Sequence, residues 1–324
     1  MDMFEHGSLL DAVDARARRA GSNTLELLLF SLGTEEIFGI NVFKVREITP
    51  TPAITQAPNL PHGVQGVVSL RGSIIPVISL AKLAGVDTVE CAMTTMMVTE
   101  FSRRVQGFLL TGVDRIARID WERVRTPDPT LSGANGYITA ITDLGDGRLV
   151  SILDVEQILA TIYGDIEVPE LESLSTPGAT VFFVDDSAVA RKQIVRVLDR
   201  LELKHLHAVN GREAWERLQA MADRAEAEGE PLSRRIHVIL TDAEMPEMDG
   251  YVLARCIKGD ARFTGIPVVM HSSLSSEANR AMGIHVGVDA YVSKFDPRAL
   301  AETLRPLLAQ QTAAAAASPE VHHD

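Results

Sequence analysis

The sequence lacks any apolar run as long as the roughly 18 residues that a membrane-spanning helix requires. Its first 21 residues contain acids and no sustained apolar core, so they do not resemble a signal peptide. Cysteine is scarce as well. Cys91 and Cys256 are the two in the chain, and their wide separation suits a reducing compartment better than a disulfide framework. These absences predict a cytoplasmic protein without direct membrane insertion.

Basic residues are outnumbered by acidic ones. The chain has 31 Lys and Arg residues against 44 Asp and Glu residues, which gives a formal net charge of −13 at pH 7. Proteins that bind nucleic acid usually carry a basic face. The one dense basic run, at residues 16–19, is not followed by aromatic residues, and we interpret it as a solvated helix face. We therefore expect no nucleic-acid partner.

The length of 324 residues is enough for about two domains. Prolines, glycines and acids interrupt the regular apolar pattern at residues 163–180, which indicates a linker. The alanine-rich end of the chain is low in complexity. We predict an N-terminal extension or helix (1–22), a first domain (23–163), a linker (164–179), a second domain (180–309) and a disordered tail (310–324).

The first domain has the pattern of an all-β protein. Many short apolar segments are separated by Gly and Pro, which favours a sandwich or a barrel. Gly145-Asp146-Gly147 predicts a hairpin turn. Asp154 is placed to cap a closing helix, with Gln157 three residues later as in a capping box.

The second domain has an alternating α/β pattern. Short apolar strands are predicted at residues 180–184, 237–242, 266–273 and 290–294, with helical periodicity between them. Strands that are apolar on both faces indicate a parallel sheet covered on both sides. Right-handed crossovers make such a sheet doubly wound, and its ligand site lies at the carboxyl ends of the strands.

Polar residues stand at all four of these strand ends. Asp185 and Asp186 follow the first strand, Asp242 the second, Ser272 the third and Lys294 the fourth. A single polar residue can simply end a strand, but four in this order favour a shared site. Clustered carboxylates repel one another, and Mg²⁺ relieves that repulsion. A lysine and a hydroxyl beside a metal-bound aspartate favour phosphate chemistry, and an aspartate can itself accept a phosphoryl group.

These residues, with "ILTDAEMPEMDG" and "AYVSK", resemble the receiver domains of two-component response regulators from about Thr180 to Leu308. The resemblance implies a flavodoxin-like fold. It also implies that Asp242 is the phosphoacceptor. The implied Mg²⁺ ligands are Asp185, Asp186, Asp242 and the main-chain carbonyl of Glu244. Ser272 and Lys294 are implied to contact the phosphoryl group, and Tyr291 is implied to be an aromatic switch residue.

Two positions depart from the usual receiver pattern. Phe295 follows Lys294, where the family usually has proline. Glu244 adds a negative charge two residues after the acceptor, near the attack path of water, and so bears on the lifetime of the phosphoryl group.

No catalytic constellation is evident before residue 165, so this half is expected to bind a partner. The segments "FGINVFKVREI" and "VQGVVSLRGSIIPVISLAKL" resemble the CheW family of chemotaxis coupling proteins, over about Asn23 to Ile162. That resemblance implies two five-stranded β-barrels that bridge a chemoreceptor and a CheA-type histidine kinase. It also implies partner contacts at Val45, Gly66 and Arg71. Val45 as a core residue, Gly66 as a turn glycine and Arg71 as an intramolecular brace remain alternatives.

The order of the two domains resembles CheV-type chemotaxis coupling proteins. The resulting prediction is a multidomain protein with an all-β CheW-like double barrel and a doubly wound α/β receiver. Its expected function is that of an adaptor, associated with membrane receptor arrays through its partners. It would not be a turnover enzyme. The alternatives are a phosphate sink that drains the kinase, a phosphatase with an aspartate nucleophile, and a transcription regulator.

Overall fold

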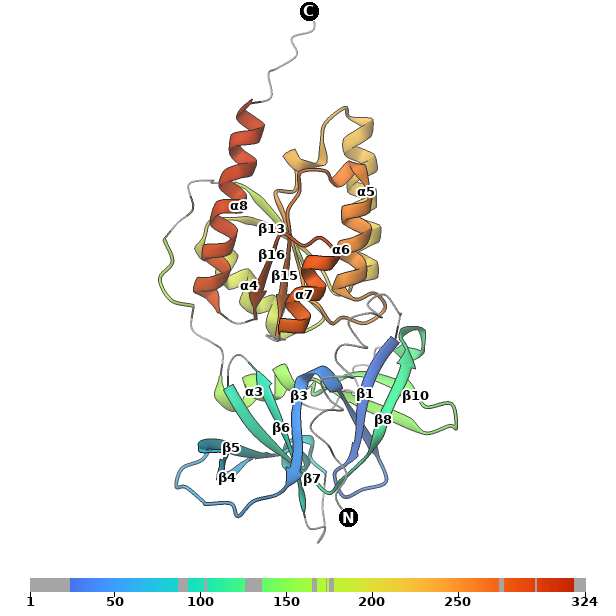
Figure 1. Cartoon of the computed structure of the whole chain (residues 1–324), viewed down its shortest axis with the longest axis vertical. Helices are drawn as coiled ribbons and strands as arrows, with labels where there is room; N and C mark the ends of the chain where they lie inside the picture. Colours follow the sequence, from blue (N-terminus) through green and yellow to red (C-terminus); the bar gives the residue numbers. More distant parts are fainter. Residues whose placement is uncertain are drawn as a thin grey trace, which may run out of the picture. The chain divides into compact units, whose positions relative to one another are not determined.

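The structure is a computed structural model, and it describes residues 24–86, 93–101, 104–125, 136–164, 168–172, 174, 178–273, 277–294 and 296–317. The chain divides into two compact units between residues 166 and 167 (Figure 1). The predicted N-terminal extension (1–22) and Phe295 lie outside the described residues. Within the described part, no helix has both the length and the apolar character needed to cross a membrane.

The first unit contains two β-sheets in its described residues, with six and five strands. The six-stranded sheet has the order β8-β1-β2-β11-β10-β9 and the five-stranded sheet the order β3-β6-β7-β5-β4. Their bounds are β1 Thr24–Ser31, β2 Ile37–Asn41, β3 Val45–Pro50, β4 Val64–Leu70, β5 Ser73–Ser79, β6 Thr95–Phe101, β7 Arg104–Leu110, β8 Gly112–Asp120, β9 Val124–Arg125, β10 Ile138–Asp143 and β11 Leu149–Leu153. The predicted β-rich class is confirmed, with one more strand in one sheet than the resemblance implied.

Short helices and turns complete the first unit. The helices are α2 Leu80–Ala84 and α3 Val155–Tyr163, with single 3₁₀ turns at Val42–Lys44 and Trp121–Arg123. The Asp154 carboxylate accepts the Gln157 N–H at 3.0 Å, so the predicted cap of α3 is confirmed. The predicted hairpin is also confirmed, because Gly145 and Gly147 have positive φ between β10 and β11.

The second unit is a parallel sheet of five strands in the order β13-β12-β14-β15-β16, with helices packed around it. The predicted doubly wound, flavodoxin-like class is therefore confirmed. The bounds are β12 Thr180–Val184, α4 Ala188–Arg200, β13 Lys204–Ala208, α5 Gly211–Ala227, β14 Val238–Thr241, α6 Gly250–Gly259, β15 Val268–Ser272, α7 Glu277–His285, β16 Ala290–Ser293 and α8 Pro297–Ala317, with 3₁₀ turns at Leu232–Arg234 and Ala261–Phe263.

Two elements of the second unit differ from the sequence-based expectation. Strand β13 was not predicted, because its sequence KHLHA lies at the edge of the sheet and is mostly exposed. Helix α8 continues to Ala317, through residues 310–317 that were assigned to a disordered tail. Alanine has the highest helix propensity, so an alanine-rich stretch continues a helix that packing has already started. Residues 318–324 lie outside the described part of the chain.

The hairpin between β4 and β5 requires unusual backbone conformations. Arg71 and Gly72 have φ of 50° and 83°, and two consecutive positive φ values are typical of a type I′ turn. Gly66 has φ 156° beside an irregularity in the β4–β5 register. A Cβ atom at Gly66 would lie 2.4 Å from the carbonyl oxygen of Thr55. The crossing of these two backbone segments therefore requires glycine at position 66.

We predict that Gly66→Ala lowers the free energy of unfolding of the first unit by about 3 kcal/mol, because it adds a backbone clash to φ strain. Gly72→Ala is the matched control: its Cβ would meet nothing within 4 Å, so we expect a loss of about 1 kcal/mol. Urea unfolding followed by Trp121 fluorescence, in a Trp215→Phe background, measures both. Equal losses for the two variants would contradict the close approach.

Candidate functional site

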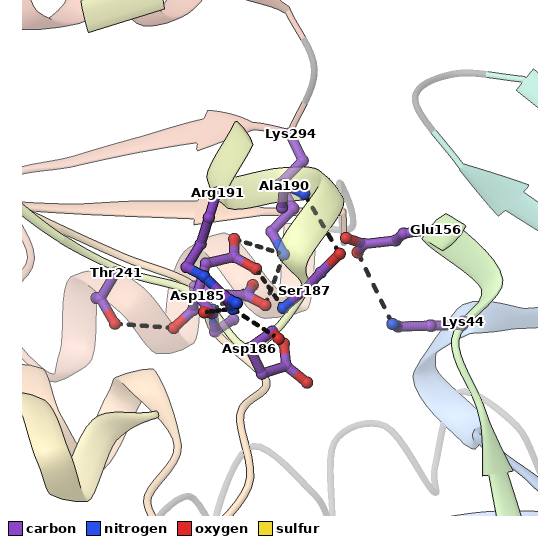
Figure 2. Close-up of polar contacts among 11 residues, drawn as sticks. Lys44, Glu156, Asp185, Asp186, Ser187, Ala190, Arg191, Thr241 and Lys294 are labelled. Atoms are coloured by element: carbon purple, nitrogen blue, oxygen red, sulfur yellow. Dashed lines mark hydrogen bonds and ion pairs between the residues drawn. The ribbon is translucent and has the colours of Figure 1, made fainter. Parts of the chain in front are cut away.

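The polar residues at the four predicted strand ends meet at one edge of the second sheet. Strands β12, β14, β15 and β16 are parallel neighbours; the last residues of β12 and β14 pair in register, as do those of β15 and β16, and Thr241 at the end of β14 pairs with Met270 of β15. The Lys294 N–H donates to the Ser272 carbonyl at 2.8 Å, which joins the third and fourth ends directly. Figure 2 shows Asp185, Asp186 and Lys294 converging beside the start of α4. The structure therefore brings together residues that are up to about a hundred positions apart in the sequence.

Three carboxylates form the centre of this site. Asp185, Asp186 and Asp242 each offer an oxygen within 4.8 Å of the others, and Asp185 and Asp242 are 0% and 5% exposed. The ammonium of Lys294 lies 3.0 Å from Asp185 Oδ2 and 2.6 Å from Asp242 Oδ2. Three carboxylates and one ammonium leave an excess of two negative charges among these four side chains. That excess, with an all-oxygen donor set, fits a hard divalent cation such as Mg²⁺.

The loop after β12 is held in place by hydrogen bonds to its backbone. Asp185 Oδ1 accepts the Ser187 N–H at 3.0 Å, and Ser187 Oγ caps α4 by accepting the Ala190 N–H. Arg191 Nη1 donates to the carbonyl oxygens of Asp185 and Asp186, each at 2.8 Å (Figure 2). Arg191 was not among the residues predicted from the sequence. An arginine one turn into the helix after an acidic pair is the signal that could have identified it.

The loop after β14 is equally constrained. Asp242 Oδ1 accepts the Ala243 N–H at 2.7 Å, and the Gly250 N–H donates to the Ala243 carbonyl at 3.0 Å. A Cβ atom at Gly250 would lie 1.8 Å from the Asp242 carbonyl oxygen, so only glycine permits this close return of the chain. Asp249 then caps α6 by accepting the Val252 N–H at 2.7 Å. Glu244 lies half-buried in this loop, two residues after Asp242.

Ser272 and Tyr291 occupy the neighbouring strands β15 and β16. Ser272 is 1% exposed at the end of β15. Burial raises the pKa of the Tyr291 hydroxyl to about 12, and the side chains of Ser272 and Tyr251 are its neighbouring hydrogen-bonding groups. The serine and the tyrosine that the receiver resemblance pairs are therefore adjacent in the structure.

The three candidate partner residues of the first unit lie in and around the β3 and β4–β5 strands. Val45 begins β3 and is half-buried, and Gly66 is buried. Arg71 Nη2 donates to Glu47 Oε2 of β3 at 2.6 Å, while 70% of the arginine side chain remains exposed. The contact matches the intramolecular brace that was one alternative for Arg71. The rest of the Arg71 side chain is exposed, so the partner contact that was the other alternative for Arg71 stays a prediction.

Comparison with known proteins agrees with this division into two units. Residues 26–162 match the CheW-like domain family and residues 181–305 the response regulator receiver domain family, so the chain combines these two classes. It is 32% identical over 280 residues to the chemotaxis protein CheV3 of Helicobacter pylori, covering 85% of this chain and 89% of that protein. It is 27% identical over 309 residues to CheV2 of the same organism, covering 89% and 96%. The chain belongs to the CheV family.

Similarity to a solved structure is found for the first unit. The scaffolding protein TtCheW of Thermoanaerobacter tengcongensis has 26% sequence identity and a TM-score of 0.40, and the match covers 43% of this chain and 90% of that one.

We predict that Arg191→Met weakens Mg²⁺ binding by about tenfold, because the carbonyls that position the two acidic side chains lose their donor. Arg200→Met, on the exposed last turn of the same helix, is the matched control and should leave the affinity unchanged. Isothermal titration with MgCl₂ measures both. A tenfold loss in both variants, or in neither, would contradict a positioning role for Arg191.

Proposed function

We propose that this protein is a chemotaxis adaptor whose coupling activity is controlled by phosphorylation of Asp242. The CheW-like domain would link chemoreceptors to a CheA-type histidine kinase. The receiver domain would accept phosphoryl groups from that kinase. We take residues 23–163 as the coupling domain and 180–309 as the receiver, joined by the segment 164–179. The protein would act in the cytoplasm at membrane receptor arrays.

The observation that supports the receiver role best is the pairing of buried Asp242 with Lys294 beside a second acidic pair. In the proposed step, a carboxylate oxygen of Asp242 forms an O–P bond while the P–N bond of a kinase phosphohistidine breaks. The histidine leaves as the neutral imidazole after taking up a proton. Lys294 lies 2.6 Å from Asp242 Oδ2, so its ammonium would neutralise negative charge on the phosphoryl oxygens once the group is transferred to Asp242.

Mg²⁺ fits this site, with Asp185, Asp186, Asp242 and the main-chain carbonyl of Glu244 as its proposed ligands. When bound, it would neutralise phosphoryl oxygens that otherwise face three carboxylates. The hydroxyl of Ser272 would donate to the phosphoryl group, and Tyr291 would respond to its movement. Hydrolysis of the acyl phosphate returns Asp242 to its starting state, so the cycle transmits a signal and does not turn over a substrate.

We predict that Asp242→Ala abolishes phosphotransfer from a CheA-type kinase, because it removes the acceptor carboxylate. Asp199→Ala, at an exposed aspartate of α4, is the control and should be phosphorylated as the wild type is. Transfer of ³²P from the autophosphorylated kinase is measured alongside kinase activity in receptor arrays. Failure of transfer to the wild type would refute the receiver role. If transfer occurs but array activity is the same with and without Asp242, the protein is a phosphate sink and not a switch.

For the coupling domain, we predict that Arg71→Glu weakens binding to kinase or receptor by tenfold or more, because it places two acids side by side and reverses an exposed charge. The control is the charge exchange Arg71→Glu with Glu47→Arg, which restores the internal pair. Affinity is measured by titration with purified partner. Recovery in the double variant would assign Arg71 to bracing alone. Continued loss would assign it to the partner surface.

A further inference from the structure

The loop after β14 contains a strained turn at Glu247. The Met248 N–H donates to the Pro246 carbonyl at 2.7 Å, and Glu247 between them has φ 65°. A hydrogen bond that spans three residues, with positive φ at the central one, defines the rarer and strained form of the γ-turn. Residues other than glycine seldom adopt positive φ, so this turn persists only where surrounding contacts hold it.

Two of the contacts that hold this turn come from the α5 entry, which we define as residues 208–211 at the start of helix α5. The Nδ2 amide of Asn210 donates to Glu247 Oε1 at 3.2 Å. A Cβ atom at Gly211 would lie 2.2 Å from the Met248 carbonyl oxygen. Gly211 does not have positive φ, so the close approach itself requires glycine here. The α5 entry therefore contacts both the side chain and the backbone of the turn.

The α5 entry is itself fixed by hydrogen bonds. The Ala208 carbonyl, at the end of β13, accepts the Asp185 N–H at 3.3 Å. Asn210 Oδ1 caps α5 by accepting the Glu213 N–H at 2.7 Å, and Glu213 Oε2 accepts the Val209 N–H at 3.0 Å. Because it is bonded to the loop after β12 and contacts the loop after β14, the α5 entry connects the two loops that carry the proposed Mg²⁺ ligands.

The turn at Glu247 limits where the main-chain carbonyl of Glu244 can lie. The Gly250 N–H closes the loop on the Ala243 carbonyl at 3.0 Å, and Met245 is buried in the core. With these two points fixed, the path of the chain from Met245 to Gly250 depends on the turn. Mg²⁺ demands near-ideal octahedral geometry and tolerates small displacements of a ligand poorly. A shift of the turn that moves Glu244 is therefore expected to weaken the metal site.

We propose that Asn210 and Gly211 are positioning residues of the metal site: they hold the turn at Glu247 and thereby place the main-chain carbonyl of Glu244 for Mg²⁺. This inference rests on the Mg²⁺ site of the proposed function, in which that carbonyl is a ligand. A purely structural contact between the α5 entry and the loop would stabilise the fold with and without metal. Its loss would lower the free energy of unfolding and leave the Mg²⁺ affinity of the folded protein unchanged.

The main test is Gly211→Ala in the full-length protein, titrated calorimetrically with MgCl₂. The added methyl group displaces the Met248 carbonyl, so we expect the dissociation constant for Mg²⁺ to rise about tenfold. Gly259→Ala, at the last residue of α6, is the matched control: its Cβ would meet nothing within 4 Å, and the affinity should equal that of the wild type. Urea unfolding without Mg²⁺ measures the purely structural effect separately. Wild-type Mg²⁺ affinity in a folded Gly211→Ala protein would overturn the inference.

A second pair of variants tests the side-chain hydrogen bond and decides the case even if Gly211→Ala does not fold. Asn210→Ser keeps an oxygen that caps α5 but is too short to reach Glu247. We expect it to bind Mg²⁺ about threefold more weakly, the effect of one exposed hydrogen bond. Glu247→Gln keeps an acceptor for Asn210 and should bind Mg²⁺ as the wild type does. Equal affinity in Asn210→Ser and the wild type would contradict the positioning role.

The inference and the proposed function fail in distinguishable ways. A wild-type protein that binds no Mg²⁺ would overturn the inference together with the metal site. A wild-type protein that binds Mg²⁺ but accepts no phosphoryl group from the kinase would refute the proposed function and leave the inference standing.

Discussion

The contact of Lys294 with Asp185 and Asp242 is the constraint on which the receiver unit depends. All three residues are at most 5% exposed, and the lysine ammonium lies within 3.0 Å of both carboxylates. Removing one partner from a buried charge pair typically costs about 3–5 kcal/mol, because the remaining charge is left desolvated. The ends of β12, β14 and β16 must therefore meet, which ties the order and register of the sheet to the chemistry at its edge. The charges that destabilise the fold when unpaired are the same charges that suit it to a cation and a phosphoryl group.

The two units use different physical means to present their candidate functional residues. In the receiver unit, loops held by backbone hydrogen bonds position the acids, as Arg191 does for Asp185 and Asp186. In the coupling unit, a tight hairpin with two positive φ values carries Arg71 outward, and a pair with Glu47 orients it. The first arrangement concentrates charge among mostly buried side chains. The second leaves the charged side chain of Arg71 mostly exposed.

Sequence patterns predicted the elements with a strong local signature. The apolar strand β12, the cap of α3 at Asp154 and the hairpin between β10 and β11 all have such signatures and all were confirmed. The edge strand β13 has a mixed, mostly exposed sequence, so only its pairing with β12 makes it a strand. The disordered tail predicted at residues 310–324 did not anticipate that α8 continues through 310–317, because low complexity was interpreted as disorder, whereas alanine favours a helix once one end is packed.

Sequence alone was enough to establish two domains, their fold classes and the identity of the polar residues at the strand ends, because those properties follow from periodicity and from the rule that parallel strands end together. Tertiary contacts were needed for everything that depends on distance between remote residues. Asp242 and Lys294 are 52 positions apart and meet at 2.6 Å. The Arg71–Glu47 pair and the buried hydroxyl of Tyr251 beside Tyr291 likewise have no local signature. The physical reason is that the partners of a buried or paired side chain are set by how the elements pack, and packing is not a property of any short segment.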